Sequence, residues 1–302
     1  MRRWMMRALC LVVLGLSLFA GYQFYKQRND GFSVERISSS FENSLDWDIS
    51  VTARQLYTAN EILRQPFYYL NHGFQCYAFV SQDGKYVLKF LRHQRLCPPV
   101  LLQWLPQVGF IKDLKEKKSQ ERAKRANALF RSLKLAFTDV PQETGVVFVH
   151  LNKTTGMHPQ VTIHDKSGAA YTIMLDDKEF ALQERASYIK PTIEALMKEG
   201  SVQRAKERID ELFILLVRCA ERGVCDEDRA LIHKDNIGYL PDRAIYIDAG
   251  RLVKRSQLVN RAYMTRDLQR LNPLYKWLLK HYPVLAEHFQ SVKKSTLESI
   301  QP

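Results

Sequence analysis

The sequence predicts an α+β fold in which a strand-rich half precedes a helical half. Residues 65–183 contain several short runs of β-branched and aromatic residues bounded by turn residues, with one long helical pattern among them. From residue 184 onward, apolar residues recur mostly at helical spacing. Because the strands are grouped rather than alternating with helices, this order favours an α+β architecture over a parallel βαβ sheet. The 302 residues, 46% of them hydrophobic, suffice for a two-lobed core.

A hairpin and a basic helix are the clearest elements of the first half. Strands at 75–81 and 85–90 flank Asp83-Gly84, a turn dipeptide that supplies the positive φ of a tight hairpin. A long basic helix is expected at 112–135, where apolar residues recur at helical spacing. The other expected elements are a helix at 52–63, strands at 145–151, 160–164, 170–175, 179–183 and 244–247, and helices at 189–198, 201–222, 265–281 and 284–293.

The N-terminus predicts a membrane anchor. Three arginines precede an apolar run from Ala8 to Tyr25, whose 18 residues would span about 27 Å as a helix, enough to cross a hydrocarbon core. No good small-residue cleavage site follows, so an uncleaved signal anchor is favoured over a cleaved signal peptide. The protein is therefore expected to be a single-pass membrane protein. The small difference in flanking positive charge leaves open the side on which the domain lies.

The domain organisation follows from these elements. Residues 1–28 would form the anchor, 29–64 a polar tether with a docking helix, 65–183 a strand-rich lobe and 184–302 a helical lobe. The formal net charge of +13 favours anionic membrane surfaces, polyanions or phosphorylated ligands as partners. The basic helix is a candidate contact for an anionic surface. Nucleic acid is not expected as a partner, because that helix lacks interleaved aromatic residues for stacking on single strands. Five dispersed cysteines without a CxxC pair argue against a zinc site.

Lys89 is the first candidate functional residue. It lies in an apolar strand pattern, Tyr86 to Phe90, and points where a buried residue would be expected. A turn containing Gly73 opens the hairpin, and a flexible turn before two strands can cover phosphates while the lysine offers one cation. The alternative is an ordinary strand lysine whose ammonium group reaches solvent.

A second candidate group of acids follows the long helix expected at 201–222. It comprises Asp226, Asp228, Asp235, Asn236 and Asp248. The last of these ends an apolar strand and precedes Ala249-Gly250, a position suited to holding a magnesium ion. Asn236, twelve residues earlier, would supply a neutral oxygen to the same ion. Each residue alone is as well explained by an ordinary loop or capping role, so the combination carries the interpretation.

The strand sequence VLKF with Lys89, the acid-to-asparagine loop ending at Asn236 and the IDAG sequence with Asp248 resemble the protein-kinase-like superfamily, which includes small-molecule phosphotransferases. The resemblance spans roughly residues 67–280 and implies a two-lobed kinase-like fold with a β-rich N-lobe, one long helix and a helical C-lobe. It implies that Lys89 contacts ATP phosphates and that Asn236 and Asp248 hold Mg²⁺. Gly73 would belong to the phosphate-covering loop, and Glu121 or Glu116 of the basic helix would pair with the lysine.

The chain departs from the family pattern at two places. The glycine-rich loop keeps only Gly73, which weakens tight phosphate clamping. The usual spacing puts the catalytic aspartate five residues before the asparagine, where this chain has Leu231. Asp228, or else Asp226, would reach the site through a longer loop.

Two functions follow from the resemblance and its departures. The first is an ATP- and magnesium-dependent phosphotransferase that acts on the hydroxyl group of a protein or a small molecule. The alternative is a membrane-anchored pseudokinase, a binding scaffold without turnover, which the reduced glycine loop and the displaced aspartate favour.

Overall fold

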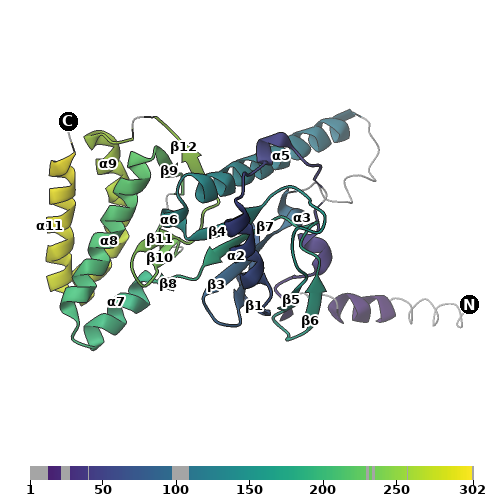
Figure 1. Cartoon of the computed structure of the whole chain (residues 1–302), viewed down its shortest axis with the longest axis horizontal. Helices are drawn as coiled ribbons and strands as arrows, with labels where there is room; N and C mark the ends of the chain where they lie inside the picture. Colours follow the sequence, from purple (N-terminus) through teal and green to yellow (C-terminus); the bar gives the residue numbers. More distant parts are fainter. Residues whose placement is uncertain are drawn as a thin grey trace, which may run out of the picture.

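The computed structural model describes residues 13–21, 28–39, 41–96, 109–228, 231–232, 235–256 and 258–300. It has a mixed α+β architecture, with a large sheet beside a group of helices (Figure 1). The strands of the large sheet are β1 (Phe67–His72), β2 (Cys76–Ser81), β3 (Tyr86–Leu91), β4 (Val146–His150), β5 (Val161–His164), β6 (Ala170–Ile173) and β7 (Phe180–Glu184).

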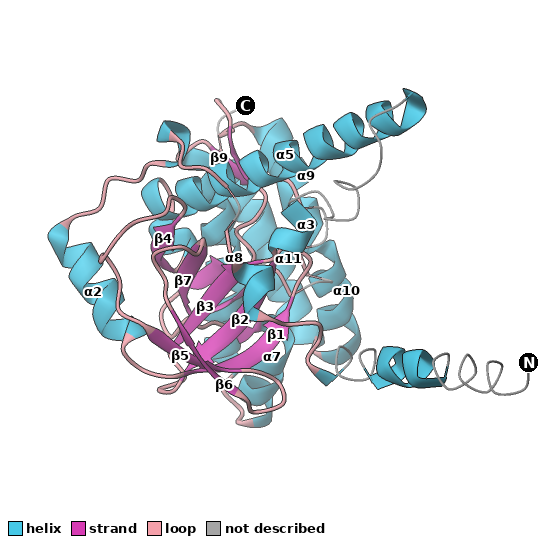
Figure 2. Ribbon diagram, turned by 90° about the vertical axis from the view of Figure 1, so that its right-hand side faces the viewer, coloured by secondary structure: helices cyan, strands magenta, loops and turns pink. Residues whose placement is uncertain are grey.

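The large sheet has the strand order β4-β7-β3-β2-β1-β5-β6, and Figure 2 shows β4, β7, β3, β2 and β1 in succession. All neighbouring strands are antiparallel except β1 and β5, which run parallel. The hairpin of β2 and β3 turns at Gly84, whose φ of 73° confirms the predicted positive-φ position. The strand β1 was not expected. Most of its residues are exposed, so its sequence lacks a regular alternation of buried and exposed residues.

The two faces of the sheet belong to two different hydrophobic cores. Leu88 and Phe90 of β3 point into one core, where they meet aromatic residues of β1, β2, β4 and β7. The opposite face contributes Leu91 of β3 and Ala181 of β7 to the second core, which is mainly helical. Lys89 lies on this second face, as its alternation in the strand predicts.

The segment expected as a tether and docking helix contributes to the first core. Phe32 and Ile37 are fully or almost fully buried there, and Ile37 ends the 3₁₀ helix η1 (Val34–Ile37). The helix α2 (Ala53–Leu63) begins where predicted, because Thr52 forms a capping box with Gln55. A second 3₁₀ helix, η2, spans Leu45–Trp47.

The long basic helix α5 (Gly109–Thr138) connects the sheet to the helical part, along the top of the view in Figure 1. Its buried residues between Ala126 and Phe137 belong to the second core. Two short helices flank it in sequence, α3 (His93–Leu96) and α6 (Pro141–Thr144).

The helical part largely follows the predicted pattern. Its helices are α7 (Ile189–Lys198), α8 (Val202–Glu221), α9 (Arg261–Leu268), η3 (Gln269–Leu271), α10 (Asn272–His281) and α11 (Pro283–Ser299). The single helix expected at 265–281 is wrong. The chain forms α9 from Arg261, where the Asn260 side chain accepts from the Tyr263 N–H at 2.8 Å, and it then breaks into η3 before α10. Pro273 lies in the first turn of α10, the position where its missing N–H costs least.

Of the five short strands around the helical part, β11 lies within the strand expected at 244–247, and the other four were not predicted. The five are β8 (Ser187–Tyr188), β9 (Val224–Asp226), β10 (Ile237–Tyr239), β11 (Ala244–Tyr246) and β12 (Leu252–Lys254). They form one three-stranded sheet, β11-β10-β8, and one two-stranded sheet, β12-β9. Two- and three-residue strands are too short to show a period-two pattern in the sequence.

Polar contacts fasten the large sheet to the helical part. The buried Gln183 amide of β7 donates to the Thr144 carbonyl at 2.5 Å and to the Tyr246 carbonyl of β11 at 2.9 Å. The neighbouring Glu184 pairs with Arg243 at 2.6 Å. These bonds fix the region where the chain passes from the sheet to the helices.

The predicted membrane anchor lies only partly within the described residues. Residues 13–21 are helical, and the remainder of the run from Ala8 to Tyr25 lies outside the description. Among the helices that are described, none has the length and apolar character needed to span a bilayer.

We expect Gln183→Leu to lower the free energy of unfolding by about 2 kcal/mol, because it leaves two buried carbonyl groups without their amide donor. Urea denaturation of the full-length chain in detergent measures this change. Gln203→Leu, at an exposed position near the start of α8, is the control and should change stability little. Equal stability of the two variants would contradict the fastening role of Gln183.

Candidate active site

The antiparallel pairing of β10 with β11 brings Asn236 beside Asp248. In this hairpin Ile237 pairs with Tyr246, so the residue before β10 faces the residues after β11. The Asn236 carbonyl accepts from the Ile247 N–H at 2.7 Å and from the Asp248 N–H at 3.4 Å. Twelve residues apart in sequence, the two predicted metal ligands are thus neighbours in space.

The Asn236 side chain also contacts Asp228. Its amide nitrogen donates to the Asp228 carboxylate at 3.2 Å, and both side chains are largely buried. This bond directs the Asn236 amide oxygen away from Asp228. Asp235, next to Asn236, adopts a left-handed backbone conformation with φ of 51° and makes the turn that precedes β10. The structure therefore brings together three of the polar residues singled out in the sequence.

Lys89 reaches the same region from the sheet. Its Nζ donates to the carbonyl of Ile247 at 2.5 Å, one residue before Asp248. The residues paired with it on the flanking strands are Ala78 and Ala181, whose short side chains lie on the same face. The lysine is thus surrounded by small residues within the sheet and directed toward the Asn236–Asp248 pair.

Asp226 is engaged in structural contacts. It ends β9, accepts from the Asp228 N–H at 3.0 Å and forms an ion pair with Arg270 at 2.7 Å. Burial raises the pKa of Asp226 to about 6, against the opposing effects of the Asp228 N–H and Arg270. Arg270 also pairs with Asp267 at 2.6 Å and donates to the Asp228 carbonyl. The acid nearer to Asn236 and Asp248 is therefore Asp228.

Arg270 is a residue of this site that was not predicted from the sequence. It follows α9 in the short helix η3, within a stretch where basic residues are common. Its importance comes from tertiary contacts with a loop more than forty residues away in sequence. We interpret Arg270 as a residue that positions the acidic loop.

The turn that contains Gly73 lies over the segment after Asp248. The Gly73 N–H donates to the Cys76 carbonyl at 2.9 Å, and its own carbonyl accepts from Arg92 at 2.6 Å. The Gln75 side chain lies against Gly250, where a Cβ atom would come within 2.1 Å of its Oε1. The turn therefore contacts the Asp248 segment through Gln75, while the N–H of its one glycine is already used.

The glutamates of α5 do not join Lys89. Glu116 pairs with Lys112 at 3.9 Å on an exposed stretch of the helix, and Glu121 is exposed as well. The helix instead contacts the segment after Asp248 through the buried Ser132. Its Oγ donates to the Ala249 carbonyl at 2.5 Å and accepts from the Leu252 N–H at 2.6 Å.

The donor groups at this site fit a magnesium ion bound together with phosphates. No group of three or more His, Cys, Asp or Glu side chains in the described part of the chain is arranged to hold a metal ion alone. Magnesium at phosphate sites commonly takes one or two carboxylates and completes its shell with phosphate and water oxygens. Asp248 is exposed, and its Oδ1 accepts from the Gly250 N–H at 3.0 Å. Asn236 beside it would add a neutral oxygen.

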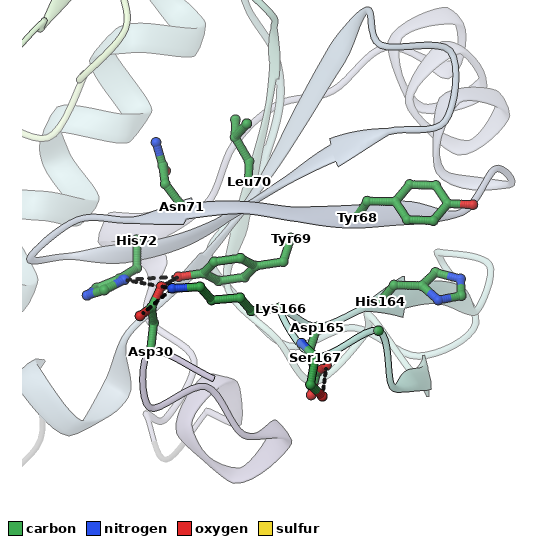
Figure 3. A pocket seen from close by; sticks show the side chains of 11 residues that line it. Asp30, Tyr68, Tyr69, Leu70, Asn71, His72, His164, Asp165, Lys166 and Ser167 are labelled. Carbon is green, nitrogen blue, oxygen red and sulfur yellow. Dashed lines mark hydrogen bonds and ion pairs between the residues drawn. The ribbon is translucent and has the colours of Figure 1, made fainter. Parts of the chain in front are cut away.

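A separate cavity of about 770 Å³ lies at the edge formed by β1, β5 and the segment around Asp30 (Figure 3). There Asp30 accepts from Tyr69 at 2.9 Å and from Lys166 at 3.0 Å, while Tyr68 stacks on His164. None of the predicted site residues lines it, so it is distinct from the candidate site.

No protein-family model matches the chain, and no characterised protein matches it in sequence. Solved structures of WbdD do match. A complex of WbdD with a kinase inhibitor shows 12% identity and a TM-score of 0.35, over 76% of this chain and 45% of that chain. A structure described as the bifunctional kinase-methyltransferase WbdD shows 12% identity and a TM-score of 0.34, over 76% and 43%. This chain spans less than half of those chains, and likeness at this level does not establish a shared fold.

We expect Asp226→Asn to raise the free energy of unfolding relative to the wild type by an amount that grows as the pH rises from 4 to 7. The folded-state pKa of Asp226, about 6, lies above its ordinary value of 3.8, so the wild type loses stability as the carboxyl ionises over this range. The gain of the variant over the wild type should grow by an amount on the order of 3 kcal/mol. Denaturant unfolding at pH 4 and pH 7 measures it. Asp242→Asn, at an exposed turn, is the control for the substitution itself.

Proposed function

We propose that the protein is a kinase-like phosphotransferase that uses ATP and Mg²⁺. One observation carries this proposal. Lys89 donates to the carbonyl of Ile247, the residue before Asp248, while Asn236 is hydrogen-bonded through its backbone to Asp248 and through its side chain to Asp228. A cation, two carboxylates and an amide thus converge from distant parts of the chain, which is the set of groups that phosphoryl transfer requires.

The order of elements supports a kinase-like fold. The antiparallel pair β1 and β2 comes first, followed by β3 with Lys89, the long helix α5 and the strands β4 and β7. All of them precede the helical part. The five strands β4-β7-β3-β2-β1 form one antiparallel sheet, and the hairpin of β5 and β6 extends it at the β1 edge. The passage from the sheet to the helices runs through Gln183 and Glu184.

The residues divide into three roles in this proposal. Lys89 would orient the phosphates, and Asn236 with Asp248 would hold the metal. Magnesium-bound ATP would supply the phosphoryl group and charge neutralisation. The oxygen of the acceptor hydroxyl would form a bond to the terminal phosphorus of ATP, and Asp228 would accept the hydroxyl proton as that bond forms. The bond from that phosphorus to the bridging oxygen would break, and ADP would leave with the electron pair.

A second candidate function is a nucleotide-binding or inactive scaffold. Lys89 is bonded to a backbone carbonyl, and neither Glu116 nor Glu121 of α5 approaches it. The Gly73 N–H is used within its own turn. These contacts favour a pseudokinase, because they lack the lysine–glutamate pair of an active protein kinase.

We further propose that the apolar run from Ala8 to Tyr25 anchors the protein in a membrane as a single-pass segment. The acceptor would be a protein or a small molecule, and the basic helix α5 would offer a contact for an anionic surface. This arrangement would keep the domain close to acceptors at a membrane.

We expect Lys89→Ala and Asp248→Asn to weaken the binding of ATP and Mg²⁺. Ligand at about 100 times its Kd adds about 2.7 kcal/mol to stability, which thermal denaturation of the full-length chain in detergent detects. Lys89→Ala should lose most of this gain, and Asp248→Asn should lose the part that depends on magnesium. Lys85→Ala and Asp242→Asn, both at exposed positions, are the matched controls. No stabilisation of the folded wild type at millimolar ATP would refute nucleotide binding.

We expect Asp228→Asn to separate turnover from binding. Removing a general base lowers turnover by about 10²- to 10⁴-fold, whereas nucleotide affinity should stay near that of the wild type. The measurement is ATP turnover beside the thermal stabilisation by ATP and Mg²⁺. Wild-type binding without turnover above the level of Asp228→Asn would instead support the scaffold.

A further inference from the structure

A second cavity lies at Gly250, two residues after Asp248. It has a volume of about 440 Å³ and is lined by Gln75, Gly250, Arg95, Arg125, Arg251 and Glu227 among others. Gly250 and Gln75 are also the residues through which the Gly73 turn contacts the Asp248 segment. The cavity therefore adjoins the segment that contains Asp248.

The three arginines reach this cavity from three separate elements. Arg95 comes from α3, where its guanidinium lies over the Phe74 ring at 5.1 Å, and Arg125 comes from the middle of α5. Arg251 follows Gly250 directly. Exposed arginines are ordinary in a chain of net charge +13, but three that converge on one cavity from distant segments need a stronger explanation.

The one carboxylate among the described residues of the cavity lining, that of Glu227, does not balance the positive charge of the three arginines. Glu227 forms an ion pair with Arg255 at 2.5 Å, outside the lining. Between described residues, no ion pair involves Arg95 or Arg125. Arg251 lies 3.9 Å from the Asp228 carboxylate, so it borders both the cavity and the proposed catalytic acid. An anion in the cavity would offset the repulsion among the three guanidinium groups.

We infer that this cavity binds a phosphate group of the phosphoryl acceptor. The inference rests on the proposed function and names the acceptor class: a small molecule that carries both a phosphate and a free hydroxyl. Guanidinium groups bind phosphate oxygens in a bidentate, directional manner, which suits arginines better than lysines to this task. Because Arg251 borders both sites, a phosphate held in the cavity keeps the rest of the acceptor next to Asp228.

The test uses the full-length chain in detergent, with inorganic phosphate and glycerol 3-phosphate as probes in calorimetric titrations. The double variant Arg95→Gln/Arg125→Gln should weaken the binding of glycerol 3-phosphate by about tenfold or more. Arg131→Gln, an exposed arginine of α5 outside the cavity, is the control and should bind as the wild type does. The binding of ATP and Mg²⁺ should be the same in all of these proteins.

The outcomes separate this inference from the proposed function. Lys89→Ala should bind glycerol 3-phosphate normally, since the nucleotide site and the arginine cavity are different. Equal affinity of the double variant and the wild type for glycerol 3-phosphate would overturn the cavity assignment. Inorganic phosphate that binds as tightly as the organic phosphate would indicate a free-phosphate site and overturn the acceptor role. If the wild type binds glycerol 3-phosphate but not ATP with Mg²⁺, the proposed function is overturned and the anion site is still shown.

Discussion

The pairing of β10 with β11 is the constraint on which the candidate site depends. It is a short hairpin, yet its register sets Asn236 against both Ile247 and Asp248. A third strand, β8, completes this small sheet, and it approaches so closely that a Cβ atom on Gly238 would lie 2.5 Å from the Ser187 carbonyl. Glycine at this position is thus required for the third strand to pair. Without that strand the hairpin would be a marginal two-stranded ribbon.

Directional polar contacts, added to the apolar cores, determine how the sheet meets the helical part. One face of the sheet shares the helical core, but apolar contact is not directional and fixes orientation poorly. Gln183, Lys89 and Ser132 each bond a backbone carbonyl of the segment from Tyr246 to Ala249. Three donors from β7, β3 and α5 thus hold one four-residue stretch. Asp248 lies within that stretch, so the same bonds that join the two parts also position the proposed metal ligand.

The sequence was informative wherever local chemistry decides the structure. The turn at Gly84 is a local signal, and it predicted a hairpin correctly. The helix expected at 52–63 begins where predicted, at a capping box of Thr52 with Gln55. Local signals failed where long-range contacts decide, as for the short strands β8, β9, β10 and β12, which carry no readable period. The polar residues of the site were identified from residue type and spacing. Their partners were not, because Arg270 is an unremarkable basic residue until the fold brings it to Asp226.

Whether Lys89 is available to a nucleotide is a question of relative energies. A hydrogen bond from an ammonium group contributes about 1.5–3 kcal/mol net, and the bond to the Ile247 carbonyl belongs to this class. Binding at a micromolar Kd corresponds to about 8 kcal/mol, and at a millimolar Kd to about 4 kcal/mol. Phosphates that bind with micromolar affinity would therefore recruit the lysine from the carbonyl at a cost of about a fifth to two fifths of the binding energy, whereas for a millimolar ligand the same loss is about two fifths to three quarters of it. The carbonyl contact accordingly sets a threshold of affinity rather than excluding catalysis, and it ties the choice between phosphotransferase and scaffold to the strength of nucleotide binding.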